Sequence, residues 1–170
     1  LFEKDGAGYK VIDGHQRLIT VTILLSAAFT TLQRDRGLKE SEKMLYEDTL
    51  RRGSYVYRFS TFDNDNQFLR DYVIDQTRKD RSDLPTVSAT RIAAAFDYYF
   101  AELKDYDEQT LSRLMHGILE ANCTTHTIEN EAQAMQMFIF QNRGRLPANP
   151  EVVKAQFMHH AGLHGGDDAS

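Results

Sequence analysis

The chain contains one cysteine, three prolines and no tryptophan among its 170 residues. A single thiol, that of Cys123, excludes an internal disulfide, so we expect a protein of the reducing cytoplasm. Long hydrophobic runs are absent as well. The longest apolar stretch covers residues 18–29, which is shorter than the roughly 20 residues of a membrane-spanning helix. We therefore expect this stretch to form a buried helix of a globular core, with no membrane as a partner.

An excess of basic residues is also absent. Lys and Arg number 20 against 25 Asp and Glu, which gives a formal net charge of −5. Domains that coat nucleic acid are usually basic, so we do not expect a general DNA-binding surface, although a local basic pocket is compatible with this charge. The sequence also lacks a GxxxxGK(S/T) phosphate loop, a GxSxG elbow and a paired CxxC, which excludes the classes that those motifs define.

The hydrophobic spacing predicts an α+β domain that is mostly α-helical and has a small sheet. Periodic apolar residues and capping residues predict helices over residues 14–34, 41–52, 64–77, 88–105, 108–119, 129–142 and 149–160. β-Branched and aromatic residues predict short strands over residues 9–13, 55–61 and 122–128. These strands are far apart in the sequence, so the helices must bring them together. We expect one domain over residues 1–164 with a flexible tail over residues 165–170, as a piece of a longer protein.

The stretch VIDGHQRL places five polar or small residues between a predicted strand and the first helix: Asp13, Gly14, His15, Gln16 and Arg17. One interpretation is an ordinary Asp-Gly turn with Asp13 as the helix cap and solvated polar side chains. The other is a pocket for an anion. The first N–H groups of a helix have no intrahelical partner and suit phosphate. Arg17 adds a planar fork of donors, Gly14 permits close approach, and His15 can transfer protons near neutral pH.

A second polar stretch, QNRGRL, ends the most apolar of the predicted helices and contains Asn142, Arg143 and Gly144. Arginine near the C-terminus of a helix is favourable to the helix dipole, so a basic C-cap is one interpretation. The other interpretation is a second group of phosphate contacts that faces the first. The spacing alone does not decide between the two.

Both stretches carry a resemblance to a known family. YKVIDGHQRLITVTILL resembles the DGQQR-type motif in the N-terminal domain of GmrSD-type modification-dependent restriction systems. YRFSTFDNDNQFLRDYV is similar to the strand and helix that follow in that family, and ENEAQAMQMFIFQNRGRLPANPEVVKAQF is similar to its second motif. The motifs occur in the family's order and together cover nearly the whole chain.

The resemblance implies a ParB/sulfiredoxin-like core with a helical extension, whose sheet is here incomplete at the N-terminus. It also implies binding and hydrolysis of nucleoside triphosphates (NTPs) in defence against phage DNA. Asp13, Gly14, Gln16 and Arg17 match the first motif, and residues 142–144 match the second. His15 replaces the first glutamine of the DGQQR pattern. The HNH-type pattern of the nuclease domain that many relatives carry C-terminally does not occur in the chain.

Our first hypothesis is an NTP-hydrolysing module of a DNA-restriction protein, with Asp13, His15 and Arg17 as the catalytic group and Mg²⁺ held by Asp13. Gly14, Gln16 and Arg17 would bind the nucleotide together with the second motif, Asn142, Arg143 and Gly144. Its partners would be DNA, bound through the full-length protein, and a C-terminal nuclease domain or a partner subunit, with a homo-oligomer left open. The alternative is a catalytically inactive regulatory or DNA- or partner-binding scaffold domain. A domain that itself cuts DNA is a third, less favoured idea, because no metal-binding cluster supports it.

Overall fold

The computed structural model describes residues 2–5, 8–61, 63–80, 83–84 and 86–128. The chain divides into two compact units. One is formed by residues 1–13 and 125–170, and the other by residues 14–124. The predicted helices over residues 129–142 and 149–160 lie outside the described residues. Within the part that is described, α-helices predominate and two small sheets are present, so the predicted α+β class is confirmed.

The first unit contains a three-stranded sheet in the order β2-β1-β5. β1 (Phe2–Asp5) and β2 (Gly8–Val11) form an antiparallel pair, and β5 (Thr127–Ile128) lies parallel to β1. The predicted strand near residue 9 is confirmed, whereas β1 was not predicted, because its sequence FEKD has one apolar residue followed by three charged ones and so lacks a strand pattern. The strand predicted over residues 122–128 pairs only at its end. Segments far apart in the sequence therefore meet in one sheet, as expected.

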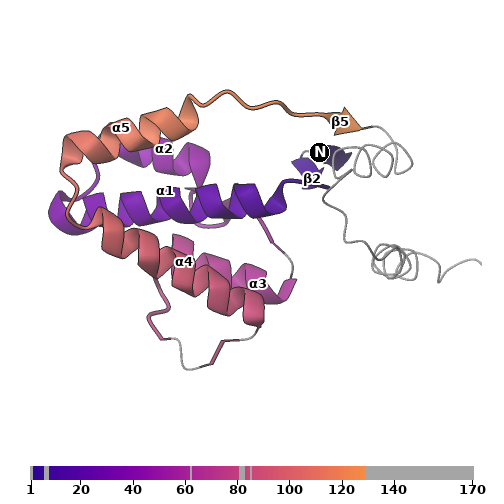
Figure 1. Ribbon diagram of the computed structural model, residues 1–170, viewed down its shortest axis with the longest axis horizontal. Coiled ribbons are helices and arrows are strands. Elements are labelled where there is room, and N and C mark those ends of the chain that lie inside the picture. Colours follow the sequence, from indigo (N-terminus) through magenta and orange to yellow (C-terminus); the bar gives the residue numbers. More distant parts are fainter. Residues whose placement is uncertain (1, 6–7, 62, 81–82, 85, 129–170) are drawn as a thin grey trace, which may run out of the picture. The chain divides into compact units, whose positions relative to one another are not determined.

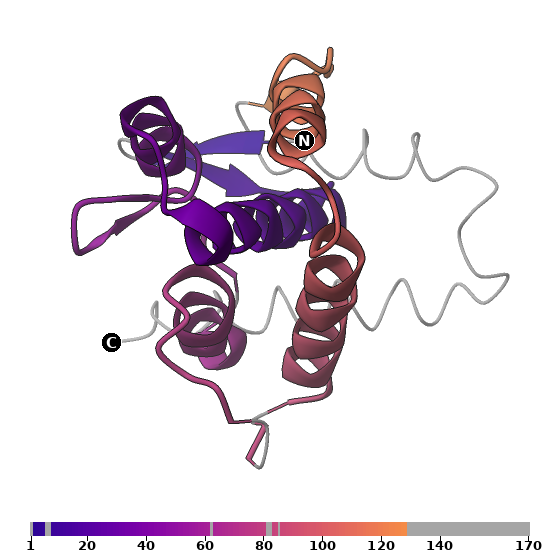
Figure 2. The same ribbon diagram turned by 90° about the vertical axis from the view of Figure 1, so that its left-hand side faces the viewer.

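The second unit consists of helices and one hairpin (Figure 1). In chain order its elements are α1 (His15–Arg36), α2 (Glu40–Thr49), β3 (Arg51–Arg52), β4 (Val56–Tyr57), α3 (Asp63–Phe68), the π-helix η1 (Leu69–Ile74), α4 (Val87–Leu103) and α5 (Glu108–Leu119). α1 occupies the centre and contacts α2, η1, α4 and α5. Figures 1 and 2 both show α1 between α4 and α5.

The core of this unit forms around α1 because α1 is apolar on most of its circumference. Ten of its residues are buried, among them Ile23, Phe29 and Leu32. Its buried polar groups have partners: Ser26 donates a hydrogen bond of 2.5 Å to the carbonyl of Val73, and neighbouring hydroxyls bond back to carbonyls of α1 itself. Burial of such side chains supplies most of the stability of a small domain, at about 25 cal/mol per Å² of apolar surface.

The helix predicted over residues 64–77 differs in its second half, which is the π-helix η1. The N–H of Asp75 bonds to the carbonyl of Arg70 at 2.8 Å, five residues back. The carbonyl of Val73 accepts from Ser26 and from the amide of Gln76 (2.8 Å), and Gln76 itself has a φ of 56°. Tertiary hydrogen bonds thus replace the ordinary helical ladder here. No local sequence pattern contains that information.

Two other boundaries were wrong. The helix predicted over residues 41–52 ends at Thr49, because Arg51–Arg52 pair with Val56–Tyr57 around a turn at Gly53, whose φ is 58°. The strand predicted over residues 55–61 is accordingly confined to two residues. The starts of α4 and α5 follow from capping: Thr86 accepts from the N–H of Ala89, and Asp107 accepts from the N–H of Thr110.

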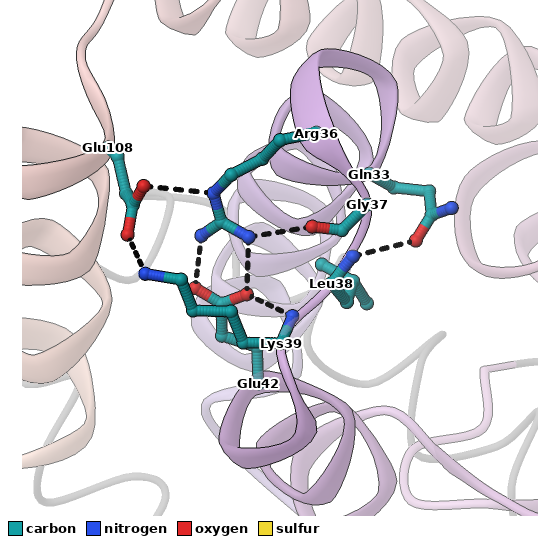
Figure 3. A network of polar contacts seen from close by, with 7 residues as sticks. All are labelled: Gln33, Arg36, Gly37, Leu38, Lys39, Glu42 and Glu108. Atoms are coloured by element: carbon teal, nitrogen blue, oxygen red, sulfur yellow. Dashed lines mark hydrogen bonds and ion pairs between the residues drawn. The ribbon is translucent and has the colours of Figure 1, made fainter.

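One polar network joins the end of α1 to the starts of α2 and α5 (Figure 3). The guanidinium of Arg36 bonds to both oxygens of Glu42, at 2.5 and 3.0 Å, and to Glu108 at 3.0 Å. Lys39 also pairs with Glu108, and its backbone N–H donates to Glu42 at 2.8 Å. Glu42 thus accepts from the N–H of the N-cap residue of α2 while it pairs with α1. The network fixes three helix ends against one another.

We predict that Glu42→Gln lowers stability only above acidic pH. The hydrogen bond from Arg36 holds the pKa of Glu42 below its ordinary value of 4.5, with a smaller contribution from the Lys39 N–H. A depressed folded-state pKa contributes stability above the unfolded value, and this stability is lost as the pH falls through the folded value. At pH 7 we expect a loss of about 1–2 kcal/mol, from the cap and the ion pair together.

The measurement is urea unfolding of the parent and of Glu42→Gln from pH 7 down to pH 2. The difference should shrink as the pH falls below about 4.5. Glu102→Gln, on an exposed position of α4, serves as the matched control and should show no such pH dependence. A difference for Glu42→Gln that is constant across the range would contradict the assignment.

A second prediction concerns the core. Leu32→Ala removes a fully buried side chain from α1 and should cost about 2–5 kcal/mol of unfolding free energy. The same substitution at Leu119, which is exposed at the end of α5, should cost less than about 1 kcal/mol. Equal losses in chemical denaturation would show that α1 is not the centre of the core.

Candidate functional site

The polar stretch between β2 and α1 has Gly14, rather than Asp13, at the N-cap position of α1. Gly14 has φ 96° and ψ 4°, and no side chain caps the helix through that residue. The prediction that Asp13 occupies the cap position was therefore wrong. The reason is conformational: the chain enters α1 through a left-handed turn, which a residue without Cβ adopts at little cost. Asp13 lies one residue earlier and is half-buried.

The guanidinium of Arg17 lies directly against Gly14. A Cβ at position 14 would be 3.4 Å from Nη2 of Arg17, 3.7 Å from its Nε and 3.8 Å from its Cζ. The side chain of Arg17 therefore folds back over the start of its own helix and lies in van der Waals reach of the position that a Cβ would take. Gly14 and Arg17, predicted together from the sequence, are brought together in the structure.

α1 begins at His15, and its ladder of hydrogen bonds begins three residues later. The first intrahelical bond of the ladder runs from the N–H of Leu18 to the carbonyl of Gly14, at 3.1 Å. The N–H groups of residues 15–17 precede it and have no partner within the helix. The first turn contains no acidic residue, so no carboxylate on α1 itself occupies the positive end of the helix dipole.

His15 and Gln16, the other two residues of the motif, lie in different surroundings. The ring of His15 is half-buried and packs on Phe59, with centroids 5.2 Å apart and planes at 40°. Gln16 is exposed, and its backbone carbonyl accepts from the hydroxyl of Thr20 at 2.7 Å. Sequence reasoning missed Phe59. Its only signal was the aromatic pattern of YVYRFSTF, which indicated a strand and not a contact with the motif.

The metal prediction concerns Asp13. Across the described part of the chain, no group of three or more His, Cys, Asp or Glu side chains could hold a metal ion. A preformed metal cage is therefore absent from these residues. Mg²⁺ is commonly held by one or two carboxylates, several waters and the phosphates of a substrate. Asp13 alone is one carboxylate, so binding of Mg²⁺ there stays a prediction.

The second predicted group, Asn142, Arg143 and Gly144, lies outside the described residues. The proposed meeting of Arg17 with Arg143 therefore stays a prediction. The sites that can be built from the described residues are centred on Gly14 and Arg17.

We predict that Gly14→Ala destabilises the chain. The φ of 96° is strained for alanine, whereas the new Cβ would only touch the guanidinium of Arg17, at 3.4 Å. A loss of about 1–3 kcal/mol is expected. Gly117→Ala is the matched control: Gly117 lies within α5 with no atom near its Cβ position, so alanine there should stabilise by up to about 1 kcal/mol. Thermal unfolding of both variants measures the contrast. Stabilisation by Gly14→Ala would contradict the turn geometry.

Comparison with known proteins identifies the family of the chain. No described helix is long and apolar enough to cross a membrane. No curated protein and no solved structure matches the chain significantly. One family model matches residues 2–158, which is most of the chain, and it describes the N-terminal domain of the GmrSD restriction endonuclease. The chain therefore belongs to the GmrSD restriction endonuclease N-terminal domain family.

Proposed function

We propose that this domain binds the phosphates of a nucleoside triphosphate at the start of α1 and hydrolyses it. The observation that carries the proposal is the position of Arg17 over Gly14 at the N-terminus of α1. Membership of a restriction-endonuclease family supports a role in a DNA-restriction and phage-defence system. In such a system the domain would act with a nuclease domain or a partner subunit and would meet DNA through the full-length protein. Assembly into a homo-oligomer is compatible with this role.

The N-terminal end of α1 is electrostatically suited to an anion. The N-terminus of a helix carries a partial positive charge, so a cation placed there is disfavoured and an anion is favoured. The guanidinium of Arg17 lies at this end of α1, against Gly14. A phosphate group would receive hydrogen bonds from the N–H groups of residues 15–17 and a bidentate contact from Arg17. Because Gly14 has no side chain, a ligand can reach the backbone closely.

The chemistry follows from this placement. A water oxygen would attack the terminal phosphorus, and the bond from that phosphorus to the bridging oxygen would break, leaving a diphosphate. Arg17 would stabilise the charge on the transferred group. Asp13 would hold Mg²⁺, which when bound supplies positive charge to the phosphate oxygens. Gln16 and His15 would orient the nucleotide or the attacking water. Asn142, Arg143 and Gly144 would add phosphate contacts from the second motif.

A second candidate function is a regulatory domain that has lost hydrolysis. The packing of His15 on Phe59 favours it, because an imidazole held against an aromatic ring has a structural role that glutamine would not fill. This candidate predicts NTP binding without turnover. Phosphate release by the parent chain and by His15→Gln separates the two. Hydrolysis only by His15→Gln would show that the parent chain has lost NTP hydrolysis through this residue. Hydrolysis by the parent chain would exclude the regulatory domain without hydrolysis.

We predict that Arg17→Ala weakens NTP binding by about tenfold to a hundredfold. A hydrogen bond to a charged group contributes about 1.5–3 kcal/mol, and about 1.4 kcal/mol corresponds to a tenfold change. Isothermal titration with NTP and Mg²⁺ measures the difference. Arg91→Ala is the matched control, because it removes the same charge from an exposed position of α4. Equal affinities of the two variants would contradict the proposal.

A further inference from the structure

The hairpin over residues 51–58 has an unusual tip. β3 and β4 pair Arg51 with Tyr57 and Arg52 with Val56, around the turn at Gly53. The ring of Tyr55 is 89% exposed, the highest value among the large hydrophobic side chains that are exposed in the described residues. In Figure 2 the purple hairpin that follows α2 extends outward, away from α4 and α5. A large aromatic ring is thus held in solvent at the end of a short ribbon.

The base of the hairpin is firmly held. Arg51 pairs with Asp75 at 2.5 Å, and the hydroxyl of Tyr57 donates to the same carboxylate. The guanidinium of Arg70 stacks over the ring of Tyr57, 4.4 Å from its centroid. The N–H of Arg58 donates to the carbonyl of Leu50 at 2.9 Å. These contacts come from η1 and from the end of α2, so the tip is presented on a rigid support.

The hairpin carries three arginines and no acidic residue, and Arg51 differs in role from the other two. Arg51 is part of the base, where the Asp75 side chain is only 12% exposed. Arg52 and Arg58 instead share one carboxylate, Asp48, at 2.8 and 3.6 Å. That carboxylate is 63% exposed. Ion pairs of this exposed kind contribute little net stability. Another anion can therefore replace Asp48 as the partner of these two arginines at small cost.

We propose that hairpin 51–58 binds a single strand of DNA, with phosphates on Arg52 and Arg58 and a base stacked on Tyr55. Proteins bind single strands by combining basic side chains that follow the backbone with aromatic rings that stack on bases. The hairpin supplies both within eight residues. Bases of a duplex already stack on each other, so an exposed ring gains most from an unpaired base. The net charge of −5 requires that any DNA contact be local, and this hairpin is such a local basic element.

This binding uses other residues than the proposed NTP site, since neither Gly14 nor Arg17 belongs to the hairpin, although Phe59, which directly follows the hairpin, packs on His15. DNA binding should therefore be measured without nucleotide. Arg17→Ala should leave it unchanged, so failure of one proposal does not affect the other.

The test is fluorescence anisotropy of a labelled single-stranded DNA oligonucleotide with the full chain at low salt. Tyr55→Ala should weaken binding by about fivefold to a hundredfold, the range found when a stacking aromatic is removed. Tyr98→Ala is the matched control: Tyr98 is 61% exposed on α4, and its removal should leave the affinity unchanged. Because Tyr55 is almost fully exposed, its loss should leave the melting temperature unchanged.

A gain-of-binding variant completes the test. Asp48→Asn releases Arg52 and Arg58 from their shared carboxylate and should tighten binding several-fold. Asp105→Asn removes the same charge from an exposed position between α4 and α5, and should have a smaller effect. The proposal is overturned if the parent chain does not bind the oligonucleotide, if Tyr55→Ala binds like Tyr98→Ala, or if Asp48→Asn binds no tighter than Asp105→Asn.

Discussion

Burial of α1 is the constraint on which the helical unit depends. This 22-residue helix contacts α2, η1, α4 and α5, and its apolar side chains form the centre of the core. A helix buried in this way has few ways to shift or rotate, because close packing resists small displacements. Arg36 fixes its C-terminal end to α2 and α5, and α1 begins after Gly14, which has a φ of 96°. A ligand site at the start of α1 therefore rests on a rigid support.

Much of the helical unit could be predicted from local signals. Apolar runs located α1, and the residues that begin α4 and α5 have ordinary capping chemistry. The π-helix was not predicted, and the carbonyl of Val73 within it accepts from Ser26, 47 residues away, a contact that no local pattern contains. β1 depends on a partner more than a hundred residues away, at Thr127, and on a hairpin with β2. Such contacts are properties of the fold and leave little trace in a local pattern.

The candidate site was also predictable only in its local features, because its tertiary contacts leave no local sequence pattern. A glycine before a helix and an arginine one turn later are compatible with a capped turn or with an anion site from sequence alone, and the structure brings these two side by side. The cap position was assigned wrongly to Asp13, because the residue that supplies a side chain was preferred to the residue that supplies a positive φ. The contact of His15 with Phe59 joins α1 to the segment after the hairpin and could only come from tertiary structure.

We propose two functions for different parts of the helical unit: phosphate binding at the start of α1, and binding of a DNA strand at the hairpin. Phosphate binding at α1 is the main proposal. Backbone amide chemical shifts of a ¹⁵N-labelled chain, followed by NMR during titration with NTP and Mg²⁺, test it most directly. If phosphate binds at the start of α1, we expect the largest shifts at the amides of His15, Gln16 and Arg17, with the hairpin amides unchanged. Saturable shifts elsewhere with none at these three amides, or no shifts at all, would contradict it.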